Sequence, residues 1–136
     1  MKKRSAAKPP ERLVFFIDRS LGKHDVPDAL RAKGYECAIH DDHYAQDTED
    51  EIWLSELAGR RWIVLTKDER IRYRPLEAAA LRLAGLRVFI LICGNVTGAA
   101  TAQILLKAMP KVIAFSRSRR GPFVCYIYKD GTTRMK

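Results

Sequence analysis

The sequence predicts an α/β fold, a three-layer sandwich built around a central, mainly parallel β-sheet. Continuous apolar runs such as Leu13–Ile17 and Val88–Cys93 are typical of strands that are buried on both faces. Segments with helical features alternate with these runs along the chain, as in parallel α/β proteins. The length of 136 residues suits one domain. We therefore expect a single domain over residues 12–136, with helices on both faces of the sheet.

Strands and helices are expected to alternate four times. The predicted strands are 13–17, 35–40, 62–66 and 87–93. The predicted helices are 27–33, a segment that opens at Thr48–Glu51 and ends at Gly59, 75–84, and 98 to about 108. Thr48-Glu-Asp-Glu51 matches a capping box, Pro75 suits a first helical turn, and Gly34 and Gly85 suit helix ends.

Both ends of the chain are basic. Residues 1–11 contain Lys, Arg and Pro without apolar periodicity and are predicted to be a flexible arm. Near the other end, Phe123–Tyr128 is predicted as a late strand that is followed by a turn at Lys129–Gly131. Residues 113–120 show no clear pattern. We expect residues 114–136 to form a basic appendix to the domain.

The charge is divided unevenly between the two parts of the chain. The 25 Lys and Arg exceed the 16 Asp and Glu, which gives a net charge of +9. Residues 1–77 hold 15 acids and 15 bases, whereas residues 78–136 hold 10 bases and a single acid, Asp130. This division suggests an acidic site in the first part and a surface for a polyanion in the second.

Composition also limits the cellular setting. The longest apolar runs are far shorter than the roughly 20 residues that a membrane span needs, so we expect no membrane insertion. The run behind the basic N-terminus ends at Asp18 and is too short for a secretory signal. Cys37, Cys93 and Cys125 are far apart and form no CxxC motif. We therefore predict a cytoplasmic protein whose thiols serve as small apolar side chains.

Carboxylates follow two of the predicted strands. Asp18 comes directly after the first strand, and Asp68 comes shortly after the third. Ligands of open α/β sheets bind beyond the carboxyl ends of the strands. If these strands are neighbours, as in a flavodoxin-like order, their backbones lie roughly 4.8 Å apart and both carboxylates face one pocket. Because like charges repel, this arrangement favours a divalent cation held by oxygen ligands.

A third acid is expected from the helix that begins near Thr48. Asp50 shares a helical stripe with Trp53 or Leu54 and with Leu57. If those leucines pack on the sheet, Asp50 projects over the strand ends near Asp18. The alternative is that the acids of this first turn only complement the helix dipole.

Three segments occur in a distinctive order: the strand that ends in Phe15-Phe-Ile-Asp18, the helix that opens with acids at 48–54, and Val64-Leu-Thr-Lys-Asp68. Together they resemble the PIN-like domains, in particular the compact group around the VapC-type toxin ribonucleases of bacterial toxin–antitoxin modules. The resemblance covers about residues 13–92 and implies a Rossmann-like arrangement of the sheet. It also implies a Mg²⁺- or Mn²⁺-dependent endoribonuclease, the toxin of a type II module, in which water activated by the metal hydrolyses RNA phosphodiester bonds.

The resemblance further implies the roles of single residues. By motif position, Asp18 and Asp68 look like metal ligands, and Asp50 looks like the helix acid, with Asp47 or Glu51 as substitutes. A fourth acid is common in such sites, and Glu69 and Glu77 are candidates without a clear match. Thr66 looks like the small hydroxyl residue that often precedes the last acid by two positions, although it is equally compatible with an ordinary strand threonine.

Basic residues are expected to bind the RNA. The predicted contacts at the rim of the site are Arg19, Lys67, Arg70, Arg72 and Arg74, and those in the basic second part include Arg117, Arg119 and Arg120. The aromatic residues Phe115, Phe123, Tyr126 and Tyr128 lie among the latter bases, a composition that suits single-stranded RNA. The same charges are compatible with a solvated tail or with docking of an acidic antitoxin.

Other polar motifs are weaker. His40-Asp-Asp-His43 fits no zinc template, and we expect it, like His24, to lie in a surface loop. Asn95 either touches substrate or shapes the turn at Asn95–Gly98. The resemblance implies a cognate antitoxin as partner and favours a homodimer.

Two other functional hypotheses compete with that of a toxin ribonuclease. A non-catalytic PIN-like module that binds RNA or protein is expected if Asp50 points away from the pocket. A receiver-like signalling domain also carries Asp at strand ends. It is disfavoured because a receiver has paired acids after its first strand, whereas Asp18 is followed by Arg19.

Overall fold

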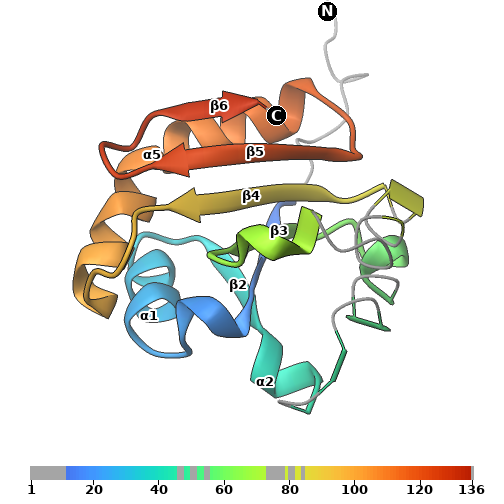
Figure 1. Cartoon of the computed structure of the whole chain (residues 1–136), viewed down its shortest axis with the longest axis horizontal. Coiled ribbons are helices and arrows are strands. Elements are labelled where there is room, and N and C mark those ends of the chain that lie inside the picture. The colour runs from blue at the N-terminus through green and yellow to red at the C-terminus, as the bar shows by residue number, and fades with distance from the viewer. Residues whose placement is uncertain are drawn as a thin grey trace, which may run out of the picture.

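A computed structural model describes residues 12–45, 48–49, 52–53, 56–72, 79, 82–83 and 85–135 of the chain. One six-stranded sheet in the order β2-β1-β3-β4-β5-β6 forms its centre (Figure 1). The strands are β1 Val14–Ile17, β2 Glu36–Ile39, β3 Ile63–Thr66, β4 Arg87–Ile92, β5 Phe123–Tyr128 and β6 Thr133–Met135. All neighbouring strands are parallel except β5 and β6. The predicted α/β fold with a mainly parallel sheet is thereby confirmed.

The two longer helices cover one face of the sheet. α1 (Asp25–Ala32) and α5 (Gly98–Ser118) pack there against each other and against the strands (Figure 1). Their buried side chains, Leu30 and Leu105 among them, meet Phe15, Leu65 and Phe89 of the sheet in one apolar cluster. The strand residues alternate between the two faces, so the neighbours of this set face the other side.

The second face is covered by residues that lie between β2 and β3. Trp53 and Leu57 are fully buried and pack on Phe16, Val64 and Val88. The ring of Trp53 lies 5.2 Å from that of Phe16. Residue 57 begins a short 3-10 helix, η3 (Leu57–Gly59). The chain thus covers both faces of the sheet, as predicted.

Parts of three predicted elements fall outside the described residues. These are the whole of the basic arm at 1–11, residues 50, 51, 54 and 55 of the helix predicted from Thr48 to Gly59, and most of the helix at 75–84.

The last helix is longer than the sequence predicted. α5 runs from Gly98 to Ser118 rather than to about residue 108, and it contains Pro110. Proline removes one helical hydrogen bond, which usually ends or kinks a helix. Here Met109, Val112 and Ser116 remain buried beyond that point, so packing on the sheet outweighs the missing bond. Residues 113–118, in the region where the sequence showed no clear pattern, therefore belong to the helix.

The residues of the expected basic appendix complete the sheet. The last turn of α5 leads to β5, which pairs in parallel with β4 over its full length. β6 then returns antiparallel along the outer edge. Phe123, Cys125 and Ile127 of β5 are buried in the core. None of the helices in the described part of the chain is long and apolar enough to cross a membrane.

Because β1 to β5 run parallel, their carboxyl ends lie together on one side of the sheet and their amino ends on the opposite side. We call these two sides the carboxyl edge and the amino edge. The carboxyl ends of β1 and β3 lead to Asp18 and to Asp68, so both acids lie at the same edge. The segments before β3, β4 and β5 lie at the opposite, amino edge. This distinction decides which basic residues can reach the acids.

Candidate metal centre

Asp18 lies at the point where β1 leaves the sheet. Its backbone N–H still donates to Leu65 O of β3 at 3.0 Å, which extends the pairing of the two strands by one residue. Its side chain then caps the short 3-10 helix η2 (Arg19–Leu21) by accepting from the N–H of Ser20 at 3.3 Å. Asp18 is only 7% exposed. A carboxylate this buried requires polar partners.

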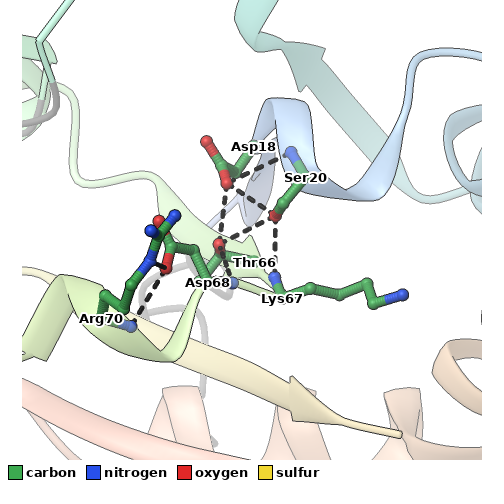
Figure 2. A network of polar contacts seen from close by, with 6 residues as sticks. All are labelled: Asp18, Ser20, Thr66, Lys67, Asp68 and Arg70. Carbon is green, nitrogen blue, oxygen red and sulfur yellow. Dashed lines mark hydrogen bonds and ion pairs between the residues drawn. The ribbon is translucent and has the colours of Figure 1, made fainter. Parts of the chain in front are cut away.

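Two hydroxyl groups supply those partners. Ser20 Oγ lies 2.7 Å and Thr66 Oγ1 lies 2.8 Å from the same oxygen, Oδ2 of Asp18 (Figure 2). Each hydroxyl also accepts a backbone N–H, Ser20 from Lys67 at 2.9 Å and Thr66 from Asp68 at 3.0 Å. A hydroxyl has one hydrogen to donate, so both hydrogens are directed at Asp18. The 3.1 Å contact between the two hydroxyl oxygens follows from their shared acceptor.

Oδ1 of Asp18 takes no part in this network. Every hydrogen bond of the Asp18 carboxylate within the described residues goes to Oδ2. In Figure 2 the other oxygen points away from the two hydroxyl groups. The network therefore fixes the orientation of the carboxylate through Oδ2 and leaves Oδ1 without a hydrogen bond from the described residues.

Asp68 follows β3 and lies across the network from Asp18. Its Oδ1 accepts from the backbone N–H of Arg70 at 3.0 Å and from Arg70 Nε at 3.1 Å. The Asp68 side chain is 18% exposed, whereas that of Arg70 is 70% exposed. Thr66 links the two acids, because its hydroxyl donates to Asp18 and accepts from the backbone of Asp68.

A pocket of about 320 Å³ opens above the two acids. Its described lining consists of Asp18, Arg19, Ser20, His40, Thr48, Asp68 and Arg70. Ser20, His40 and Thr48 were not predicted from the sequence to lie at this site. A hydroxyl residue two positions after the strand-end acid was the available signal for Ser20. No comparable signal existed for His40, because its place depends on how β2 lies beside β1.

The predicted helix acids lie outside the described residues. This applies to Asp50, Asp47 and Glu51 alike. Within the described part of the chain, no group of three His, Cys, Asp or Glu side chains could hold a metal ion. Thr48, just ahead of these acids, lines the pocket. Glu69, the proposed extra acid, is exposed at the start of η4 (Glu69–Arg72) and is not among the described lining residues.

The two described carboxylates fit a hard divalent cation. Such ions take oxygen ligands, and Asp and Glu carboxylates are their common protein donors. Asp18 presents one carboxylate oxygen that accepts no hydrogen bond from the described residues, and it shares the pocket with Asp68. Hydrogen bonds that orient a ligating carboxylate are typical of metal sites.

The predicted rim bases differ in what they contact. Arg19 lies 3.5 Å from Asp41, and Arg70 pairs with Asp68. The Lys67 side chain extends away from both acids (Figure 2). The structure does not describe the side chain of Arg72 or any part of Arg74. Arg19 and Arg70 are thus the described bases that line the pocket.

The bases near the C-terminus lie at the other edge of the sheet. Arg117, Arg119 and Arg120 surround the end of α5 and the approach to β5, at the amino edge. They therefore do not rim the Asp18–Asp68 pocket. Phe123 and Tyr126 are buried in the core, and Phe115 packs against it. The interpretation of these aromatic residues as contacts for single-stranded RNA is therefore wrong for Phe123 and Tyr126.

Two further motifs are now located. Asn95 is exposed in the turn between β4 and α5 and is not among the described pocket residues. The expected surface loop at His40–His43 is a one-turn helix, α2, and the expectation is wrong for His40, which is 1% exposed. The His40 ring packs against Phe16 and Trp53, and its Nδ1 lies 3.3 Å from Asp41. His24 is exposed, as expected.

Comparison with known proteins agrees with this geometry. The chain is 29% identical over 126 residues to "Putative ribonuclease VapC45" of Mycobacterium tuberculosis (strain ATCC 25618 / H37Rv), which covers 88% of this chain and 89% of that protein. No solved structure matches significantly. A family model described as "PIN like domain" matches residues 13–92, which include both described acids and the strands that carry them. The chain therefore belongs to the PIN-like domain family.

Proposed function

We propose that this protein is a metal-dependent endoribonuclease and the toxin component of a type II toxin–antitoxin module. The observation that carries the proposal is the pair of acids Asp18 and Asp68 at adjacent strand ends, joined through Thr66 and lining one pocket. The similarity to a protein named as a VapC ribonuclease over 88% of the chain supports the choice of RNA and of the toxin role.

The carboxylates are the proposed metal ligands. Asp18 and Asp68 hold a Mg²⁺ or Mn²⁺ ion, and Asp50 completes the set, with Asp47 or Glu51 as its substitutes and Glu69 as a further candidate. When bound, a divalent cation lowers the pKa of a coordinated water and offsets the negative charge of the phosphodiester. The pocket holds no described serine or cysteine nucleophile other than Ser20, whose hydroxyl donates to Asp18.

The remaining pocket residues orient the acids and receive the substrate. Ser20 and Thr66 hold Asp18 in one orientation through two hydrogen bonds. The exposed guanidinium groups of Arg19 and Arg70 lie at the mouth and are suited to phosphate oxygens. Arg70 also neutralises part of the charge of Asp68. Lys67, Arg72 and Asn95 complete the proposed substrate contacts.

The proposal includes the setting of the protein. A cognate antitoxin silences the nuclease, and the toxin acts in the cytoplasm, where its RNA substrates are. A homodimer is the expected assembly, and light scattering during gel filtration measures it directly.

Cleavage of RNA in the presence of Mn²⁺ or Mg²⁺ tests the activity. We expect Asp18→Asn and Asp68→Asn each to abolish cleavage, and EDTA to abolish it in the wild-type protein. Asp28→Asn is a matched control, because Asp28 is an exposed acid of α1 outside the pocket. Unchanged cleavage in both pocket variants would rule out the proposed site. RNA binding without cleavage by the wild-type protein would favour the non-catalytic module instead.

Growth after expression in a bacterium tests the toxin role separately. We expect arrest with the wild-type protein and normal growth with Asp18→Asn. Growth arrest by both proteins would show that toxicity does not depend on Asp18 and would contradict the proposal.

A further inference from the structure

A second and larger pocket lies at the amino edge of the sheet. Its volume is about 560 Å³. Five arginines and a tryptophan contribute to its lining: Arg61, Arg87, Arg117, Arg119, Arg120 and Trp62. We call it the arginine pocket. No acid is found among its described lining residues, so its charge is of one sign.

The walls of this pocket are fixed by main-chain contacts. Phe123 N donates to Leu86 O at 3.0 Å, which joins the segment before β5 to the start of β4. Gly121 lies so close to Gly85 that a Cβ at Gly121 would collide with the Gly85 carbonyl oxygen and lie 2.9 Å from that of Leu86. The segment that carries Arg119 and Arg120 is therefore held firmly against β4.

The floor of the arginine pocket contains a buried cation. Arg87 is 7% exposed, and its guanidinium donates to Ser116 O at 3.1 Å and to Arg61 O at 2.8 Å. These bonds hold the charge in a fixed orientation. Ser116 also lines the pocket, and its hydroxyl is buried without a hydrogen-bond partner among the described residues.

The rim carries three further arginines that are exposed. No ion pair within the described residues includes Arg117, Arg119 or Arg120. Arg119 lies over the ring of Phe115, with 5.8 Å between Cζ and the ring centre, which restricts its motion. Guanidinium groups present paired donors that match phosphate oxygens.

The concave shape of the arginine pocket favours a nucleic acid over an acidic protein. A concave pocket of this size suits a compact group such as a nucleotide. The ring of Trp62 forms part of the wall, but Arg60 lies over it at 4.7 Å and Phe16 stacks with it at 6.0 Å between ring centres. Binding in this pocket is therefore expected from the arginines and phosphate oxygens rather than from stacking of a base on Trp62.

We propose that the arginine pocket binds the phosphate groups of a single-stranded RNA chain at a point remote from the Asp18–Asp68 pocket. Trp62 and Asp68 bracket β3, and six residues of extended chain span roughly 20 Å. The pocket thus acts as an anchor for a part of the RNA several nucleotides from the bond that is cut. The choice of RNA rests on the function proposed above, whereas the phosphate chemistry rests on the arginines themselves.

Binding without cleavage tests this site. A fluorescent single-stranded RNA of about 20 nucleotides is titrated in EDTA with the full chain, and anisotropy gives the Kd over a range of salt concentrations. We expect Arg119→Ala/Arg120→Ala to weaken binding about tenfold and to reduce the salt slope by about 1.4, since each phosphate contact on a single strand contributes roughly 0.7. Lys33→Ala/Lys111→Ala is the control, because it removes the same charge from exposed positions outside the pocket.

Each outcome decides the question. An equal loss in both double variants would show a general charge effect and overturn the proposal, as would unchanged binding in Arg119→Ala/Arg120→Ala. If the pocket variant lost affinity for a poly-glutamate peptide but kept it for RNA, the site would belong to an acidic protein. Displacement of the RNA by AMP or inorganic phosphate at low millimolar concentration would indicate a small phosphate ligand and overturn the RNA assignment. Circular dichroism confirms that each variant is folded.

The same measurement separates this proposal from the proposed nuclease. Asp28→Asn, the control of the cleavage assay, is expected to bind RNA normally in EDTA, because Asp28 lines neither pocket. If the wild-type protein bound RNA through the arginines but cleaved none with Mn²⁺, the nuclease would be ruled out and the arginine pocket supported.

Discussion

The hydroxyl of Thr66 donates a 2.8 Å hydrogen bond to Oδ2 of Asp18, a residue 48 positions earlier in the chain. Thr66 itself is fully buried at the end of β3, and β3 pairs in parallel with β1. The same hydroxyl accepts the backbone N–H of Asp68. One side chain therefore sets the position of both acids, and it does so from inside the sheet rather than from the pocket.

Replacing that hydroxyl tests its importance. Thr66→Val keeps the shape of the side chain but removes the donor to Asp18 and the acceptor for Asp68. Partners that orient metal ligands typically contribute 10–100-fold to affinity or activity, so we expect a loss of about that size in cleavage and in Mn²⁺ binding. Thr66→Ser retains the hydroxyl and should retain most of both. Equal losses in the two variants would instead indicate a packing defect.

Ser20 offers an independent check on the same oxygen. Ser20→Ala removes the 2.7 Å bond to Asp18 and leaves Lys67 N without its acceptor. We expect cleavage to fall about tenfold. The double variant Ser20→Ala/Thr66→Val should lose less than the product of the single losses, because both hydroxyls orient one carboxylate. Fully multiplicative losses would show that the two hydroxyls act independently.

The strand-end acids were predictable because their positions depend on local pattern and topology. An apolar run that stops at Asp18, and another that stops before Asp68, locate both residues at the carboxyl edge once the strands are parallel neighbours. His40 was not predictable in this way, because its burial arises from contacts with Phe16 and Trp53 that no local pattern encodes.

The charge division along the chain was a weaker guide. It showed an excess of bases in residues 78–136, but it did not specify the edge of the sheet at which they lie. Arg117, Arg119 and Arg120 precede β5, and residues that precede a parallel strand lie at the amino edge. Similarly, Pro110 concealed the second half of α5, since the burial that sustains the helix is a tertiary effect.

The third acid can be identified by substitution. We expect Asp50→Asn to abolish cleavage as Asp18→Asn does, while Asp47→Asn and Glu51→Gln retain most activity. The reason is that Asp50 is the acid whose helical stripe includes the buried Leu57. Cleavage assays at several Mn²⁺ concentrations give the affinity of each variant for the ion. If Asp47→Asn or Glu51→Gln lost cleavage activity while Asp50→Asn kept it, the third metal ligand would be Asp47 or Glu51 instead of Asp50.

Trp53 should be a major source of stability. It is fully buried between the sheet and the helical segment, with its ring 5.2 Å from that of Phe16. Truncation of such a side chain costs about 3–5 kcal/mol, so we expect Trp53→Ala to lower the free energy of unfolding by that amount. Urea denaturation measures the change. Ile52→Ala is the control, since Ile52 is 48% exposed, and a comparable loss there would contradict the argument.

The thiols should be unreactive in the native protein. Burial raises the pKa of Cys37 from 9.0 to about 11, and burial also raises the pKa of Cys125. The thiolate is the reactive form, so labelling with a disulfide reagent at pH 8 should be slow until the protein is unfolded. The pKa of Cys37 is higher in the folded protein than in the unfolded chain. The folded state therefore has its full stability below about pH 9 and loses part of it as the pH rises towards 11, because the buried thiol must then ionise. Fast labelling of Cys37 in folded protein at pH 8 would contradict this.

Gly121 should tolerate no side chain. Its backbone lies against Gly85 and Leu86 at the wall of the arginine pocket, where a Cβ would collide with a main-chain oxygen that cannot move aside. We expect Gly121→Ala to destabilise the fold by about 1–3 kcal/mol, as overpacking does. Gly59→Ala is the matched control, because nothing lies within 4 Å of its Cβ position and its φ is not positive. Thermal denaturation of the two variants compares them directly. Since the collision separates the segment before β5 from β4, a folded Gly121→Ala protein should also bind RNA more weakly in EDTA, whereas Gly59→Ala should bind it normally.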